Sequence, residues 1–125
     1  MFEPIRIPLS QAEQTLISLL LPEGILGYFE LTKVDTEAKE LHIYLEEKNT
    51  PPNGHEKQDL ESKGFFPEVQ IQDFPIRGQK VTLCIKRLRW TVKKTGEVIS
   101  RDWDLVRKGA RMTTEFGLFL KGIFG

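Results

Sequence analysis

The stretch Lys80-Val-Thr-Leu-Cys-Ile-Lys-Arg-Leu-Arg-Trp90 carries the clearest strand pattern of the chain. In its first half apolar residues alternate with other residues, as in a strand that buries one face. These apolar residues are Val81, Leu83 and Ile85. Arg87 and Arg89 share their parity, so an unbroken strand would place two guanidinium groups in the core. We therefore predict a bulge or a strand end near Lys86.

The residues after this strand predict a second strand pair and a helix. Thr95-Gly96 is a turn signal between the segments 87–92 and 97–103, which favours a β-hairpin. In the last segment the apolar residues follow helical spacing, and Thr113 or Thr114 can cap the helix. Its apolar positions are Met112, Phe116, Phe119, Leu120, Ile123 and Phe124.

The residues before this strand predict a helix and an earlier hairpin. Ser10-Gln-Ala-Glu13 is a capping box for a helix over 11–21 whose apolar stripe includes Leu16, Leu19 and Leu20. The segments 26–34 and 40–45 are rich in strand-forming residues, and a turn at 35–39 would join them. A further strand pattern begins at Val69 and ends before a turn at Arg77-Gly78.

Residues 48–63 are polar and contain Pro51, Pro52 and Gly54, which is typical of an exposed loop or a linker. On this basis we predict an acidic helix-plus-hairpin module over 1–47 and a basic β module over 64–125 that ends in an aromatic helix. The predicted fold class is α+β and mainly antiparallel β. It has two small hairpin or sheet modules, an N-terminal helix and a C-terminal helix.

The chain has 125 residues, of which 39% are hydrophobic and 29% charged, as in ordinary globular proteins. Its longest apolar run, 16–21, is interrupted by Ser18 and is far shorter than the roughly 20 residues that cross a bilayer. The first residues lack the basic start of a signal peptide, and one cysteine permits no internal disulfide. We therefore expect a cytoplasmic protein without a membrane partner.

The net charge of zero conceals an asymmetry between the two parts of the chain. Residues 1–75 contain 6 Lys+Arg and 14 Asp+Glu, a balance of −8, whereas residues 76–125 contain 12 and 4, a balance of +8. Such a distribution indicates an anionic partner for the basic part. The other interpretation is that the two parts neutralise each other within the fold.

The sequence gives little support for a metal site, a cofactor or catalysis. Cys84, His42 and His55 do not have the spacing of metal ligands, and Cys84 is expected to be a small core residue. Asp102 and Asp104 could together hold a divalent cation, but nearby arginines favour surface ion pairs. No nucleophile elbow, phosphate loop or dinucleotide fingerprint is present, so we predict no enzyme, no metal and no cofactor.

The basic part is the better candidate for a binding site. Cationic side chains neutralise phosphates and release counterions, and a β-hairpin can enter the major groove of DNA. Trp90 and Trp103 can stack on bases or form the core beneath the arginines. The predicted DNA-binding residues are Lys86, Arg87, Arg89, Trp90, Lys93, Lys94, Arg101, Arg107, Lys108 and Arg111.

The order of several short motifs over residues 65–121 resembles the N-terminal region of bacterial insertion-sequence (DDE-type) transposases. These motifs are Asp73-Phe-Pro-Ile-Arg-Gly78, Arg87-Leu-Arg-Trp90, Arg101-Asp-Trp103 and Thr113-Thr-Glu-Phe-Gly-Leu-Phe-Leu120. In that family this region precedes the catalytic domain and helps to bind the ends of the transposon. Related members carry a zinc ribbon whose cysteine knuckle corresponds to Val92 and Thr95, so the resemblance implies a zinc-ribbon-like segment without metal.

From the charge and the resemblance we predict a DNA-binding N-terminal region of an insertion-sequence transposase. It would contact double-stranded transposon-end DNA through a basic hairpin and have no catalytic activity alone, because the family's catalytic domain would follow residue 125. The alternative is a protein-interaction module whose acidic part and aromatic stripe, with Phe116, Phe119 and Phe124, dock a catalytic transposase portion. A homo-oligomer also remains open.

Overall fold

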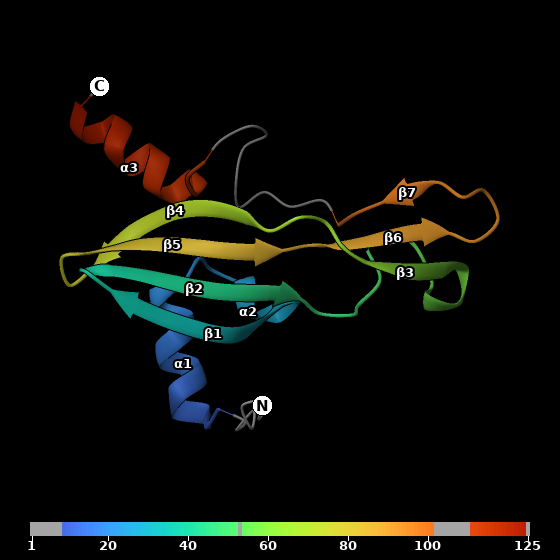
Figure 1. Ribbon diagram of the computed structural model, residues 1–125, viewed down its shortest axis with the longest axis horizontal. Coiled ribbons are helices and arrows are strands. Elements are labelled where there is room, and N and C mark those ends of the chain that lie inside the picture. Colours follow the sequence, from blue (N-terminus) through green and yellow to red (C-terminus); the bar gives the residue numbers. More distant parts are fainter. Residues whose placement is uncertain (1–8, 53, 102–110, 125) are drawn as a thin grey trace.

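The computed structural model describes residues 9–52, 54–101 and 111–124 (Figure 1). It is an α+β fold in which most strand pairs are antiparallel and the strands form two sheets. A helix precedes the first strand and another follows the last, as the sequence predicts. The helices are α1 (Gln11–Leu20), α2 (Ile25–Tyr28) and α3 (Thr114–Phe124), and a 3₁₀ turn, η1, covers Lys57–Asp59.

The larger sheet has four strands in the order β1-β2-β5-β4. The hairpin predicted over residues 26–45 is confirmed, because β1 pairs with β2 in antiparallel fashion. A second hairpin is formed by β4 and β5, which pair in antiparallel fashion on either side of the turn predicted at Arg77-Gly78. Between the hairpins, β2 and β5 pair in parallel, which joins segments from both sides of the polar residues 48–63. The strands are β1 (Phe29–Glu37), β2 (Glu40–Glu47), β4 (Val69–Ile76) and β5 (Gln79–Lys86).

Both hairpin turns use two residues with positive φ, as expected where a tight turn must match the right-handed twist of its strands. Ala38 and Lys39 have φ of 48° and 66° in the first turn. Arg77 and Gly78 have φ of 53° and 77° in the second, at the turn that the sequence predicts. The backbone Lys80 N donates to Lys39 O at 3.1 Å, so the two turns lie side by side.

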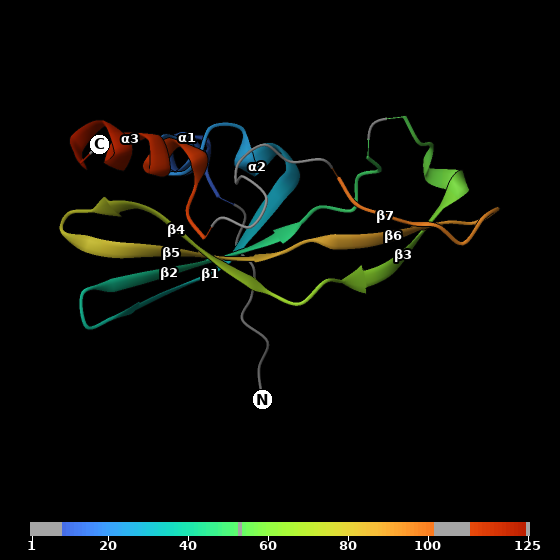
Figure 2. The ribbon, with the colours of Figure 1, turned by 90° about the horizontal axis from the view of Figure 1, so that it is seen from above.

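One face of this sheet is covered by helices and holds the main core. All three helices lie on the same side of the sheet (Figure 2). The capping box of α1 is confirmed, since Ser10 Oγ accepts from Glu13 N at 3.2 Å and Ser10 N donates to Glu13 Oε1 at 3.3 Å. The buried cluster consists of Leu21, Ile25, Phe29, Ile43, Leu45, Ile71, Val81, Leu83 and Ile85.

The smaller sheet, hereafter the arm, has the order β3-β6-β7 and projects from one end of the larger sheet (Figure 1). Its strands are β3 (Leu60–Phe65), β6 (Leu88–Val92) and β7 (Val98–Ile99). The hairpin around Thr95-Gly96 is confirmed as far as β7, and Trp103 lies outside the described residues. β3 begins inside the segment predicted to be a loop, because Leu60 is buried against Leu88 and Trp90.

The predicted break after Lys86 is confirmed, because β5 ends there and β6 starts at Leu88. Arg87 lies between the strands and shifts the alternation by one residue, so that Leu88 and Trp90 are buried and Arg89 is exposed. The extra residue thereby keeps the Arg89 guanidinium out of the core.

The helix α3 is fixed to the sheet at its first turn. The hydroxyl of Thr113 accepts from Phe116 N at 3.3 Å and donates to Asp73 Oδ1 at 2.8 Å. Thr113 is therefore the cap, one of the two predicted, and it also satisfies a buried carboxylate of β4. The ring of Phe116 packs on Phe74, 5.2 Å between centroids. Among the described residues, no helix is long and apolar enough to span a membrane.

Candidate nucleic-acid interface

The exposed cations of the arm come from β6 and the turn that follows it. Arg89 lies on the outer face of β6, and Lys93 and Lys94 lie in the turn towards β7. Lys93 N donates to Asp59 O at 3.0 Å, which holds this turn against η1. Among the described residues, none of these three side chains has an ion-pair partner, so their charges face solvent.

The arm also carries Lys57 and Lys63, which lie in the segment predicted to be a loop and are not among the predicted DNA-binding residues. Lys63 pairs with Glu61 at 3.1 Å, and its carbonyl accepts from Arg89 Nη2 at 3.4 Å. Segments 57–65 and 88–99 together contain five Lys or Arg residues and three Asp or Glu residues, so the arm is net positive. The pairing of β3 with β6, a long-range contact, brings these cations together.

Arg101, a predicted DNA-binding residue, is buried between the two sheets. Its Nε lies 3.6 Å from Glu47 Oε2, and its Nη2 donates to Thr50 O at 2.8 Å and to Pro51 O at 3.2 Å. Its guanidinium also lies over the ring of Tyr28, 4.4 Å from the centroid. In this structure Arg101 therefore connects segments of the fold instead of presenting its charge to solvent.

Two further predicted residues also have internal partners. Lys86 Nζ lies 3.9 Å from Glu46 Oε1, and Arg87 Nη2 donates to Arg101 O and, at 3.4 Å, to Ser100 Oγ. For Lys86 and Arg101 the acidic partner belongs to β2, so at these two positions the basic and acidic parts of the chain do neutralise each other.

Trp90 packs in the core of the arm with 2% of its surface exposed, which fits the core interpretation and leaves no ring face for a base.

Arg111 is exposed, and its carbonyl accepts from Gln72 N at 2.8 Å, so it lies beside β4 and away from the arm. Arg107 and Lys108, like Asp102 and Asp104, lie outside the described residues. The structure thus brings together Arg89, Lys93 and Lys94 from the predicted set.

Histidine and cysteine side chains meet on the larger sheet, although the sequence does not indicate it. Cys84 is buried as predicted, and its Sγ lies 3.9 Å from His42 Nδ1. Among the described residues, no group of three or more His, Cys, Asp or Glu side chains could hold a metal ion. The parallel pairing of β2 with β5 creates this pair, and no local pattern predicts that pairing.

Comparisons of the chain with protein-family models, with curated proteins and with solved structures find no match.

Proposed function

We propose that the protein binds double-stranded DNA through the arm, with Arg89, Lys93 and Lys94 on the phosphate backbone. The observation that carries the proposal is that these three cations share one hairpin, are exposed, and have no ion-pair partner among the described residues. Phosphate contacts of this kind supply affinity that does not depend on base sequence, because they release condensed counterions.

The resemblance to the N-terminal regions of insertion-sequence transposases suggests transposon-end DNA as the target and the cytoplasm as the location. A ribbon of this family normally depends on zinc, whereas the arm has the buried residues Leu60, Leu88 and Trp90 at its centre. Apolar packing would thus hold the hairpin in the absence of a metal. We propose direct base contacts only for Arg89, whose guanidinium can bind guanine in a bidentate manner.

The test is titration of a fluorescent inverted-repeat duplex with the full chain, followed by anisotropy at several salt concentrations. The triple variant Arg89→Ala/Lys93→Ala/Lys94→Ala should bind at least tenfold more weakly than the unchanged protein. The matched control is Arg77→Ala/Lys39→Ala/Lys80→Ala, which also removes one arginine and two lysines. These three residues lie at the exposed turns at the opposite end of the larger sheet (Figure 1). Equal losses in both variants, or binding that ignores salt, would contradict the proposal.

A second candidate function is docking of a protein partner, and a specific observation favours it. Leu16, Leu19 and Leu20 of α1 are 60%, 77% and 48% exposed, so the predicted leucine stripe does not face the sheet. Leu118, Phe119 and Ile123 of α3 are also at least half exposed, whereas Phe116 is buried. Where exposed apolar side chains form one contiguous patch, that patch is typical of an interaction surface. Light scattering with and without DNA separates the two functions, because a DNA-binding monomer shifts only with duplex.

A further inference from the structure

The face of the four-stranded sheet opposite the helices carries polar and reactive side chains in ordered rows. Residues that pair across neighbouring strands project from the same face of a sheet. Lys33, Tyr44, Cys84 and Gln70 form one such row, and Asp35, His42, Thr82 and Gln72 form the next. This face is independent of the arm and has no role in the proposed DNA binding.

On this face a thiol, an imidazole and a carboxylate follow one another within contact distance. Cys84 Sγ lies 3.9 Å from His42 Nδ1, and His42 Nε2 lies 3.3 Å from Glu40 Oε2. If Nε2 carries the proton and donates it to Glu40, Nδ1 is free to accept a proton from the thiol. A nucleophile, a base and a group that orients the base are the parts that activate a cysteine.

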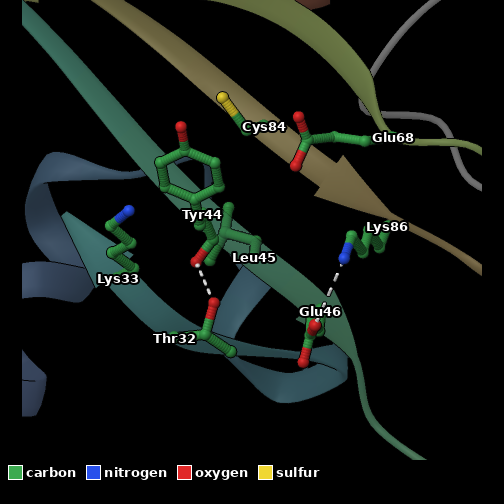
Figure 3. Close-up of a pocket in the computed structure, with 8 residues that line it drawn as sticks. All are labelled: Thr32, Lys33, Tyr44, Leu45, Glu46, Glu68, Cys84 and Lys86. Carbon is green, nitrogen blue, oxygen red and sulfur yellow. Dashed lines mark hydrogen bonds and ion pairs between the residues drawn. The ribbon is translucent and has the colours of Figure 1, made fainter. Parts of the chain in front are cut away.

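A pocket of about 90 Å³ opens beside the sulfur (Figure 3). The Cys84 thiol and the Tyr44 hydroxyl project to the same side of the sheet, and the Glu68 carboxylate lies close to Cys84. Four charged residues line the pocket: Lys86 pairs with Glu46, Lys33 pairs with Asp35, and the fourth is Glu68. An uncharged guest leaves both ion pairs intact. Since one water needs about 10–15 Å³ of such volume, the pocket suits a guest of roughly six non-hydrogen atoms.

We propose that Cys84 is the nucleophile of a covalent modification site for small, uncharged electrophiles, with His42 as the proton acceptor and Glu40 as the residue that positions His42. In this step the sulfur forms a bond to the electrophilic carbon, and the leaving group departs with the electrons of the broken bond. The thiol proton moves to His42 Nδ1, and the carboxylate of Glu40 stabilises the resulting imidazolium. No oxidant or further reactant is needed.

The base is essential at this position because the surroundings disfavour a free thiolate. Burial raises the pKa of Cys84 above its usual value, and the negative charge of Glu68 raises it further. Unassisted, the thiol stays protonated at neutral pH and reacts slowly. Transfer of its proton to an adjacent imidazole during the attack removes this obstacle.

The test is alkylation of the native, full-length protein with iodoacetamide, which has five non-hydrogen atoms, followed by mass spectrometry of the intact chain. Cys84 is the only cysteine, so one added carbamidomethyl group reports its reaction directly. We expect the unchanged protein to react to one equivalent, His42→Asn to react at least tenfold more slowly, and Glu40→Gln to react several times more slowly. With the folded chain, a fluorescein-labelled iodoacetamide should react far more slowly than iodoacetamide. With the unfolded chain, the two reagents should react at similar rates.

Asp35→Asn is the matched control for Glu40→Gln. Asp35 is also a carboxylate near His42 on this face, but it pairs with Lys33 at 3.1 Å and its charge disfavours the thiolate. Removal of the Asp35 charge should leave the alkylation rate of Cys84 unchanged or raise it, whereas Glu40→Gln should lower that rate. All variants should react equally in denaturant. An unreactive native protein, or equal native rates for the unchanged protein and Glu40→Gln, would overturn the proposal even if His42→Asn failed to fold.

Discussion

Arg101 Nε and Glu47 Oε2 lie 3.6 Å apart at the junction of the two sheets, with only 10% and 1% of their side chains exposed. Glu47 ends β2, and its Oε1 also accepts from Leu88 N at 3.1 Å, at the start of β6. One carboxylate thus contacts both β6, the middle strand of the arm, and the arginine that follows β7. The pair fixes how the arm leaves the larger sheet.

Replacement of Arg101 with methionine should destabilise the protein by about 3–5 kcal/mol at neutral pH. The change leaves the buried Glu47 carboxylate without its cationic partner, and such uncompensated charges are costly. Chemical denaturation measures the loss. The double variant Arg101→Met/Glu47→Gln removes both charges and should recover part of the lost stability. If the stability losses of the two single variants simply add in the double variant, the two side chains are not coupled and the prediction is wrong.

The same carboxylate should give the stability a specific pH dependence. Burial raises the pKa of Glu47 above its ordinary 4.5, while Leu88 N–H and the charges of Arg101 and Arg87 hold it down. The folded state therefore binds this proton more tightly than the unfolded state, and the associated stability is lost as pH rises from 4.5 through the raised pKa. The measurement is the difference in unfolding free energy between the unchanged protein and Glu47→Gln. We expect this difference to fall as the pH rises from 4.5 through the raised pKa of Glu47. A difference that rises with pH would contradict the prediction.

The local features of the fold follow from the sequence, whereas the pairing between distant segments does not. The capping box at Ser10, the two-residue turn at Arg77-Gly78 and the parity break at Arg87 are all determined within a few residues. The parallel pairing of β2 with β5 depends on which apolar faces meet in the folded chain. The contact of Cys84 with His42 follows from that pairing, so residue types alone could not reveal it.

The same limit applies to the candidate binding residues. Residue type and charge identify all the cations of the basic part, but they do not show which have partners. Arg101 is buried because Glu47 and two carbonyl groups meet it at the junction, and Lys86 faces Glu46 across the β2–β5 pairing. Arg89, Lys93 and Lys94 stay available because they lie on a projecting hairpin.

Thr113→Val should lower the unfolding free energy by about 1–3 kcal/mol. The substitution removes the cap of α3 and leaves the buried Asp73 carboxylate without its hydroxyl donor. Thermal or urea unfolding measures the effect. Thr113→Ser keeps the hydroxyl and should lose much less, so equal losses for valine and serine would show that the methyl group, and not the hydrogen bonds, matters.

The burial of Trp90 predicts its fluorescence. In a Trp103→Phe background the remaining indole, 2% exposed, should emit at short wavelength and resist quenching by iodide. Addition of duplex DNA should leave the emission largely unchanged, because the ring lies in the cluster with Leu60 and Leu88 and does not stack on bases. Strong iodide quenching that DNA prevents would instead identify Trp90 as a stacking residue.

The environment of Cys84 predicts how its reactivity changes with pH. Burial and the charges of Glu68 and Asp35 raise the pKa of the thiol, whereas a hydrogen bond from Tyr44 lowers it. His42 lies beside the sulfur and contacts Glu40. Lys33, Glu46 and Lys86 are further charged groups on this face. Glu68→Gln removes a negative charge that disfavours the thiolate, so the rise of the alkylation rate with pH should move to lower pH. At pH 8 the variant should react several times faster than the unchanged protein. Glu56→Gln, on the exposed segment before η1, should leave the profile unchanged, and a slower Glu68→Gln would show that Glu68 assists the reaction instead of opposing it.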